Sequence, residues 1–179
     1  MLQALVKLQR REMELCLALS RLQRTRLSRD IFVAASRLGD GGFWYALMAG
    51  ILVVQGVGSA VVVAHMAATG LVATLLYALL KRGTRRLRPC EADPHLVPAT
   101  PALDRYSFPS GHTLHAVSFS FLAISYFPAL ASWLVPVTLL IAASRVVLGL
   151  HYPTDVIAGA VLGFTLAQVS LVLVQLAVN

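Results

Sequence analysis

The chain has little charge for its length. Only 13% of its 179 residues are Asp, Glu, Lys or Arg, and 58% are hydrophobic, whereas about 25% of the residues in a soluble domain are charged. Three stretches contain no charged residue: 43–80, 106–144 and 156–179. Each is longer than the roughly 20 residues that cross a bilayer as a helix. The shortage of charge excludes an ordinary soluble domain and indicates an integral membrane protein.

Cysteine and clustered carboxylates are also scarce. The two cysteines, Cys16 and Cys90, lack the spacing of a metal site, a redox motif or a disulfide framework. We expect Cys16 to pack inside the protein. The chain has no carboxylate cluster for Mg²⁺ and no Walker-type loop, and its charged first thirty residues do not resemble a cleaved signal peptide. We therefore expect neither a metal nor a cofactor.

Basic residues outnumber acidic ones, and the formal net charge is +7. The Lys and Arg residues fall in 1–37, in 81–105 and at Arg145, so they flank the uncharged stretches. A basic balance can indicate nucleic acid binding. Beside membrane spans, anionic lipid headgroups or a phosphate ligand explain it better. We expect membrane lipids and a lipid phosphate as partners, and no nucleic acid.

The uncharged stretches divide into five predicted membrane helices. Residues 43–80 would form a helix of roughly 57 Å, about twice the hydrocarbon core, and the glycines in 56–60 allow a break there. The stretch 106–144 divides in the same way within 127–136. The fold class is therefore all-α, a polytopic transmembrane helix bundle. The predicted helices cover 43–55, 61–80, 110–126, 134–149 and 155–177.

The N-terminal residues 1–42 have a different pattern from the bundle domain, 43–179. Leu15, Leu19 and Leu22 recur at helical spacing with basic residues between them. The charge is too dense for a spanning helix, so we expect one amphipathic helix lying in the membrane interface, followed by a turn at 36–42. The alternative is a helix packed against the protein's own loops.

Three polar clusters lie at the ends of predicted spans: 81–89, 110–112 and 144–155. Counting spans places all three on one side of the membrane, where they can converge. The first and third clusters supply the cations Lys81, Arg88 and Arg145, and guanidinium groups bind phosphate oxygens with two parallel donors. Ser110 stands where a helix begins, and the free N–H groups of a first helical turn bind anions. The clusters therefore predict a phosphate site.

Two histidines and one carboxylate complete this set. His112 lies beside Ser110, and His151 precedes Asp155 by four residues. Pro153 suits the first turn of the last helix, so Asp155 can reach back and fix the imidazole tautomer of His151. Phosphoryl transfer requires stabilised oxygen charge, a nucleophile and a proton donor, and the set supplies all three.

Each of these residues also has a simpler interpretation. A single arginine near a span end is usually a membrane anchor, and a single histidine there is usually a hydrogen-bonded interface residue. Arg145 is an exception, because it lies deep in an apolar run, where insertion costs about 2.5–3.5 kcal/mol. We assign structural roles to His65, His95 and His115, although His115 could support His112. The remaining polar residues near the site are predicted to shape its entrance: Glu91, Asp93, Asp104 and Arg105.

With these motifs the chain resembles the type-2 phosphatidic acid phosphatase superfamily, the lipid phosphate phosphatases, as a small integral membrane member of bacterial type. The family pattern is Lys, six residues and Arg-Pro; then Pro-Ser-Gly-His; then Ser-Arg, five residues, His, three residues and Asp. This chain matches it at Lys81 to Pro89, at 109–112, and at 144–155. Members of this family commonly have six spans, whereas we predict five.

The resemblance implies a role for each matching residue. His151 would be the nucleophile that forms a phosphohistidine, Asp155 would orient it, and His112 would be the general acid. The phosphoryl oxygens would be held by the remaining motif residues: Lys81, Arg88, Ser110, Gly111 and Arg145. The implied reaction is metal-independent hydrolysis of phosphatidic acid, phosphatidylglycerophosphate or a polyprenyl phosphate or pyrophosphate.

The distribution of charge gives an expected side of the membrane. All fifteen Lys and Arg residues lie on the side of the site, so the positive-inside rule predicts a cytoplasmic site in the cell (inner) membrane. Two other functions stay open. The same bundle could be a lipid transporter or scaffold without hydrolysis, or a vanadate-dependent haloperoxidase, whose known forms are generally soluble.

Overall fold

Helices make up all the regular structure in residues 2–178, which the computed structural model describes. The apolar helices follow the predicted segments closely. The helix predicted at 61–80 continues to Thr84. The helix predicted at 134–149 begins earlier, after a short turn at Pro128, and ends earlier because Leu148 and Gly149 turn the chain. The observed bounds are α3 (Gly42–Gln55), α4 (Ala60–Thr84), α6 (Gly111–Tyr126), α7 (Ala131–Val147) and α8 (Pro153–Val178).

The lengths of these helices confirm a membrane bundle. Within the described residues, three helical segments are long and apolar enough to cross a membrane: Val57–Ala92, Pro128–Val147 and Pro153–Ala177. A fourth is added if α2 (Arg26–Leu38) and α3, which meet at 60°, form one bent span. Helices α3 and α6 have only 14 and 16 residues. The predicted all-α transmembrane class is therefore confirmed, and the number five stays a prediction.

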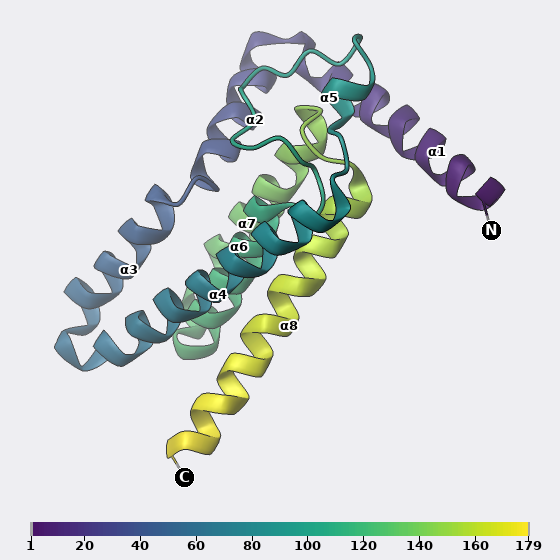
Figure 1. The fold of residues 1–179 in the computed structure, drawn as a ribbon. Helices are drawn as coiled ribbons and strands as arrows, with labels where there is room; N and C mark the ends of the chain where they lie inside the picture. The colour runs from purple at the N-terminus through teal and green to yellow at the C-terminus, as the bar shows by residue number, and fades with distance from the viewer. Residues whose placement is uncertain (1, 179) are drawn as a thin grey trace.

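Helix α6 lies in the middle of the bundle, packed against α4, α7 and α8 (Figure 1). Gly159 and Gly163 of α8 make its closest approach possible. A Cβ atom at Gly159 would lie 2.6 Å from the carbonyl oxygen of Ser110, and one at Gly163 would lie 2.5 Å from that of Leu114. Small residues four apart are typical of tightly packed membrane helices. This packing brings the first turns of α6 and α8 together, and the Ser110 N–H donates to the Asp155 carbonyl at 3.0 Å.

The N-terminal region contains two helices, where one was predicted. Helix α1 (Leu2–Ser20) ends in a short 3₁₀ turn, and α2 starts after Thr25, whose hydroxyl caps it by accepting from the Ser28 N–H at 3.3 Å. The prediction of one continuous helix was wrong because Thr25 provides a second helix start. Figure 1 shows α1 projecting away from the bundle at a steep angle.

The inner and outer faces of α1 differ. Glu12 and Cys16 are buried against the bundle, which confirms the expected packing of Cys16. Leu15, Leu19 and Leu22 are exposed on the outside. The helix therefore packs on the protein through one face and leaves the predicted apolar face open, and a membrane-interface position for that face stays a prediction.

One end of the bundle holds the polar clusters. There the end of α4, the start of α6, the end of α7 and the start of α8 meet beneath the long connection 85–110 (Figure 1). The connection includes only one short helix, α5 (Pro89–Ala92). This arrangement brings together distant segments of the chain: Lys81 and Asp155 are 74 residues apart in the sequence.

Candidate active site

A cavity of about 780 Å³ opens at the polar end of the bundle. Six of the eight predicted site residues line it: Lys81, Arg88, Gly111, His112, Arg145 and His151. The other two, Ser110 and Asp155, are fully buried directly behind them. The structure therefore brings all eight residues to one place.

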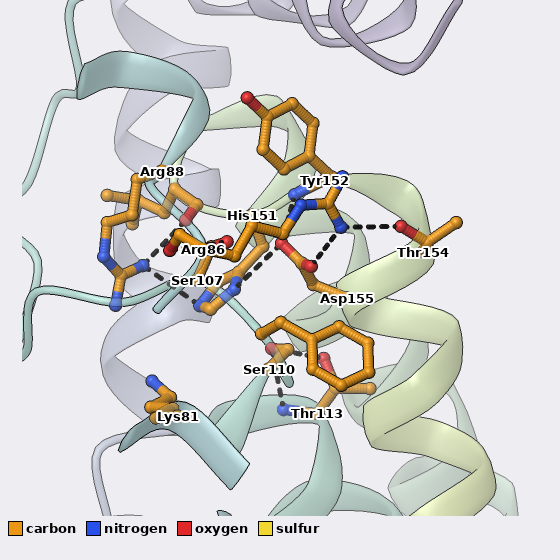
Figure 2. Close-up of polar contacts among 12 residues, drawn as sticks. Lys81, Arg86, Arg88, Ser107, Ser110, Thr113, His151, Tyr152, Thr154 and Asp155 are labelled. Carbon is orange, nitrogen blue, oxygen red and sulfur yellow. Dashed lines mark hydrogen bonds and ion pairs between the residues drawn. The ribbon is translucent and has the colours of Figure 1, made fainter. Parts of the chain in front are cut away.

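His151 lies in the turn between α7 and α8. Gly149, at φ 69°, adopts a backbone conformation that favours glycine and starts this turn, and the His151 N–H donates to the Arg145 carbonyl at 3.1 Å. The imidazole is 1% exposed. Arg88 Nη1 lies 3.2 Å from Nε2 of His151 (Figure 2). Because a guanidinium only donates, Nε2 must be the accepting, unprotonated nitrogen.

Two influences keep the His151 ring neutral. Burial lowers its pKa well below the ordinary range, and the positive charges of Arg145 and Arg88 lower it further. The proton of the neutral ring then belongs on Nδ1, which lies 3.7 Å from Oδ2 of Asp155. A neutral ring with an unprotonated Nε2 has the form that a nucleophile needs.

Asp155 lies in the first turn of α8, where Pro153 begins the helix as predicted. Its Oδ2 accepts from the Tyr152 N–H at 2.8 Å, and its Oδ1 accepts from Arg86 Nη1 at 2.6 Å (Figure 2). Asp155 is thus close to His151 but held mainly by other donors.

Lys81 and Arg88 share one carboxylate. Lys81 Nζ lies 2.8 and 2.6 Å from the two carboxylate oxygens of Asp104, and Arg88 Nη2 lies 2.7 Å from Oδ1. Burial alone would raise the pKa of Asp104, but its hydrogen bond and charge interaction with Lys81 and the charge of Arg88 outweigh burial and lower it. Asp104 was predicted only to shape the entrance. It lines the cavity and also pairs with two of the predicted phosphate ligands.

Arg145, at the end of α7, is buried but reaches the cavity. Its Nη1 hydrogen-bonds the hydroxyl of Ser36 on α2, and its Nε has no hydrogen-bond partner among the described residues. No carboxylate of the described residues forms an ion pair with it. A buried guanidinium with unused donors suits an anionic ligand.

His112 lies on the first turn of α6 and faces the N-terminal segment. Its Nε2 is 2.6 Å from Oδ1 of Asp40, in the turn between α2 and α3. The close approach depends on Gly39, where a Cβ atom would lie 2.5 Å from Cδ2 of His112. A carboxylate at this distance orients the ring.

Ser110 and Gly111 form the start of α6. The Ser110 hydroxyl is the helix N-cap: it lies 3.4 Å from the Thr113 N–H and 3.0 Å from the Thr113 hydroxyl (Figure 2). Gly111 reaches the cavity surface, whereas Ser110 does not. The helix start therefore faces the cavity through its backbone, with the serine hydroxyl used to cap the helix.

Sequence reasoning missed five residues of this network: Glu12, Ser36, Gly39, Asp40 and Arg86. Four of them come from the N-terminal region, which carries no part of the motif pattern. The fifth, Arg86, lies inside the first motif, at a position that the pattern leaves unspecified. No local signal separates Glu12, which is buried, from Glu14, which lies on the same helix and is exposed.

The residues given structural roles behave differently from one another. His65 bonds the Tyr126 hydroxyl at 2.8 Å, and His95 is exposed beside Asp93. His115 lines the cavity one turn below His112, with Nδ1 2.9 Å from the Gly111 carbonyl.

Two of the residues predicted to shape the entrance have different positions. Glu91 accepts from the backbone N–H of Arg88 at the start of α5. Arg105 lines the cavity, as predicted for an entrance residue.

Several known proteins are similar to this chain in sequence or in fold. Decaprenylphosphoryl-5-phosphoribose phosphatase of Mycolicibacterium smegmatis is 37% identical over 105 residues, which are 58% of this chain and 50% of the relative. The chain thus spans about half the length of this curated relative. Two crystal structures have a similar fold at lower identity.

The first structure is a transmembrane PAP2-type phosphatidylglycerolphosphate phosphatase from Bacillus subtilis. It has a TM-score of 0.76 and 23% identity, and the match covers 94% of this chain and 87% of the other. The second is LpxE of Aquifex aeolicus, with a TM-score of 0.69, 24% identity, and coverage of 88% and 93%. The family model described as the PAP2 superfamily matches residues 60–178, which include every motif residue above. The chain therefore belongs to the PAP2 superfamily.

Proposed function

We propose that the protein is an integral membrane lipid phosphatase that hydrolyses a phosphomonoester or pyrophosphate on a lipid through a phosphohistidine. One observation carries the proposal. A single cavity holds an accepting imidazole nitrogen, three cations and a second histidine, and apolar residues of α3 and α4 form part of its walls. The names of the relatives support the activity.

The first chemical step transfers the phosphoryl group to His151. Its Nε2 lone pair forms the P–N bond while the bond from phosphorus to the lipid oxygen breaks, and the departing oxygen takes the proton of His112. The positive ring of His151 is stabilised through Nδ1 by Asp155. In the second step water attacks phosphorus, His112 accepts a water proton, and inorganic phosphate leaves with Nε2 restored. No atom in these two steps requires a metal.

The cations stabilise charge on the phosphoryl oxygens during both steps. Lys81, Arg88 and Arg145 line the cavity beside His151, and all three are buried, where positive charge acts on a transferring phosphoryl group more strongly than in water. Asp104 supplies negative charge that balances Lys81 and Arg88. A bound phosphate competes with that carboxylate for the same donors.

The apolar part of the cavity favours a lipid. Its walls include Trp44 and Met48 of α3 and Ala67 and Leu71 of α4. Leu71 is also exposed on the outer surface of α4, which faces hydrocarbon in a membrane-spanning helix. A substrate can therefore leave its tail in the membrane while its phosphate reaches His151.

Two further arginines favour a lipid with a second phosphate. Arg82 and Arg105 line the same cavity, and neither forms an ion pair within residues 2–178. The relatives from Mycolicibacterium smegmatis and Bacillus subtilis are named for lipids that carry a terminal phosphate and a second phosphate nearer the tail. We infer the same substrate class here, a polyprenyl phosphosugar phosphate or phosphatidylglycerophosphate, in preference to phosphatidic acid.

The positive-inside rule supports a cytoplasmic site in the cell (inner) membrane. The Lys and Arg residues lie in the segments that meet at the site, and the opposite connections at 56–59 and 127–130 have none. An introduced cysteine at Ser132 would be labelled by a membrane-impermeant reagent in intact spheroplasts if this orientation is correct. Labelling only after lysis would place the site on the outer face.

Phosphate release by the purified protein tests the activity. The assay contains EDTA and four substrates: phosphatidic acid, phosphatidylglycerophosphate, undecaprenyl pyrophosphate and a polyprenyl phosphoribose phosphate. We expect release that disappears in His151→Ala and is fastest with the three lipids that carry a second phosphate. Arg82→Gln with Arg105→Gln should raise KM for those three but not for phosphatidic acid.

Other outcomes would support other functions. Lipid movement across vesicles without phosphate release would indicate a transporter on this fold. Halide oxidation that requires added vanadate would indicate a haloperoxidase. Equal rates for all four lipids would contradict the proposed second-phosphate preference while leaving the phosphatase activity in place.

A further inference from the structure

A buried acidic residue on α1 lies behind the proposed nucleophile. Glu12 is 3% exposed, although it belongs to a helix whose other charged side chains face outward. Its Oε1 accepts from the backbone N–H of Thr154 at 2.9 Å and from the Thr154 hydroxyl at 2.6 Å. Its Oε2 accepts from Arg86 Nη2 at 2.7 Å. A buried carboxylate needs such partners, and all of these belong to the site.

Arg86 connects Glu12 to the site carboxylate. Its Nη2 donates to Glu12, while its Nη1 donates to Asp155 Oδ1 at 2.6 Å and to the Thr154 hydroxyl at 2.9 Å (Figure 2). The guanidinium also lies over the Tyr152 ring, 4.0 Å from its centre. Because the guanidinium is planar and its donors have fixed directions, fixing one side of it fixes the other.

The two carboxylate oxygens of Asp155 face different partners: Oδ1 faces Arg86, and Oδ2 faces His151. With Oδ1 bound to Arg86, Oδ2 is directed to the Tyr152 N–H and to His151 Nδ1, at 2.8 and 3.7 Å. Within the described residues, His151 Nδ1 has no hydrogen-bond partner, so Asp155 is the group that can orient it. The direction of this carboxylate therefore depends on Arg86.

Helix α1 and the 3₁₀ turn that follows it (Arg21–Arg24) make two further contacts at or beside the same turn. The Cys16 thiol lies 3.8 Å from the carbonyl oxygen of His151, and Gln23 Nε2 donates to the carbonyl of Val147 at 2.6 Å. Together with Glu12, these contacts hold α1 against the turn that carries His151. The first helix of the chain thus packs directly on the proposed nucleophile's backbone.

We propose that Glu12 and Arg86 are positioning residues for catalysis: Glu12 holds the Arg86 guanidinium, and Arg86 directs the Asp155 carboxylate toward Nδ1 of His151. The proposal rests on the phosphatase function above. A network that only attaches α1 to the bundle would show the same contacts, so the test must separate positioning from attachment.

Charge-removing variants with matched controls provide the kinetic test. Glu12→Gln is compared with Glu14→Gln, the same change at an exposed ion pair with Arg10 on the same helix. Arg86→Gln is compared with Arg85→Gln, whose guanidinium contacts only a backbone carbonyl. Partners that orient metal-ligating side chains contribute about 10–100-fold to activity, and we take the same range for partners that orient a nucleophilic histidine. We expect a fall in kcat of that size for Arg86→Gln, a smaller fall for Glu12→Gln, little change in KM, and near-normal kinetics for both controls.

A double variant tests whether the effect passes through Asp155. In an Asp155→Asn background, assayed with a reactive aryl phosphate, Glu12→Gln should cause no further loss of kcat, because the group that it acts through is already impaired. An attachment role predicts an equal further loss in both backgrounds. Arg86→Lys keeps the charge but not the planar guanidinium, so its kcat should lie between those of Arg86→Gln and the unaltered protein. This variant replaces Arg86→Gln in the test if Arg86→Gln does not fold.

An activity-independent measurement separates this proposal from the phosphatase function. In protein with ¹⁵N-labelled histidine, the imidazole signals of His151 are assigned by their loss in His151→Ala. We expect these signals to change in Glu12→Gln and Arg86→Lys but not in Glu14→Gln. Unchanged His151 signals, or a lower melting temperature with normal kcat, would overturn the positioning role. Lack of phosphate release by the unaltered protein would instead count against the proposed function.

Discussion

The motif segments and the N-terminal region contribute to the site in different ways. Residues 81–155 supply every group proposed to touch the phosphate, and they lie at helix ends in the bundle. Residues 1–42 supply groups that contact those residues from outside: Glu12 through Arg86, Ser36 at Arg145 and Asp40 at His112. In the proposed function, the first region provides the chemical groups and the second orients them.

This difference has a physical cause. A histidine or arginine in a low-dielectric site needs a hydrogen-bonding partner to fix its direction, and the ends of membrane helices leave few polar neighbours. A segment that packs over those ends can supply such partners without crossing the membrane. The predictions below test whether the N-terminal contacts act on catalysis or only on stability.

The largest effect is expected for Asp40→Asn. Without the carboxylate, His112 loses its orienting partner, so we expect kcat/KM on a lipid alcohol leaving group to fall on the order of 10²-fold, the lower range for general acid catalysis. Rates with p-nitrophenyl phosphate should change little, since that leaving group needs no proton. Asp30→Asn, an exposed ion-pair residue on α2, is the control. An equal loss of kcat/KM on both substrates would contradict the assignment of His112 as the general acid.

Gly39→Ala should have a moderate effect through the same histidine. The added methyl group would lie 2.5 Å from the His112 ring and must displace it. We expect a fall in kcat of about tenfold and a loss of about 1–3 kcal/mol in stability, the usual cost of overpacking. Gly42→Ala, where a Cβ atom meets nothing within 4 Å, should behave like the unaltered protein in both kinetics and thermal unfolding.

Asp104→Asn should strengthen anion binding. Removing the carboxylate frees Lys81 and Arg88 for an external anion, so the inhibition constant for vanadate should fall by about three- to tenfold, equivalent to roughly 1 kcal/mol. Asp93→Asn, in the same connection but paired only with His95, is the control. Weaker vanadate inhibition in Asp104→Asn would show that this carboxylate supports the anion site and does not compete for it.

The last prediction concerns stability against pH and not kinetics. His151 is neutral in the folded protein because its pKa is lowered by burial and by nearby cations, whereas in the unfolded chain it gains a proton below about pH 6.5. Folding stability therefore falls as pH decreases below that value, by up to about 1.4 kcal/mol per pH unit. Between pH 7 and pH 5, the melting temperature should fall more for the unaltered protein than for His151→Gln. Equal falls would contradict a neutral buried ring.

Much of this arrangement could be predicted from the sequence. The absence of charge located the apolar helices, and counting spans placed His112 and His151 at one end, because helix length fixes which ends meet. The break at Thr25 and the partners Glu12 and Asp40 could not be found in this way. Their contacts depend on how α1 and α2 pack against the bundle, and no local periodicity records a pairing between residues as distant as Glu12 and Thr154.

Trapping the phosphoenzyme tests the central claim most directly. The purified protein is mixed with substrate labelled in its terminal phosphate and denatured within milliseconds to seconds in alkali, where phosphohistidine survives. The account predicts label on the peptide that contains His151, lost on acid treatment, absent in His151→Ala and increased in His112→Ala when an aryl phosphate is the substrate. Rapid phosphate release without protein-bound label at any time, or label on His112, would contradict His151 as the nucleophile.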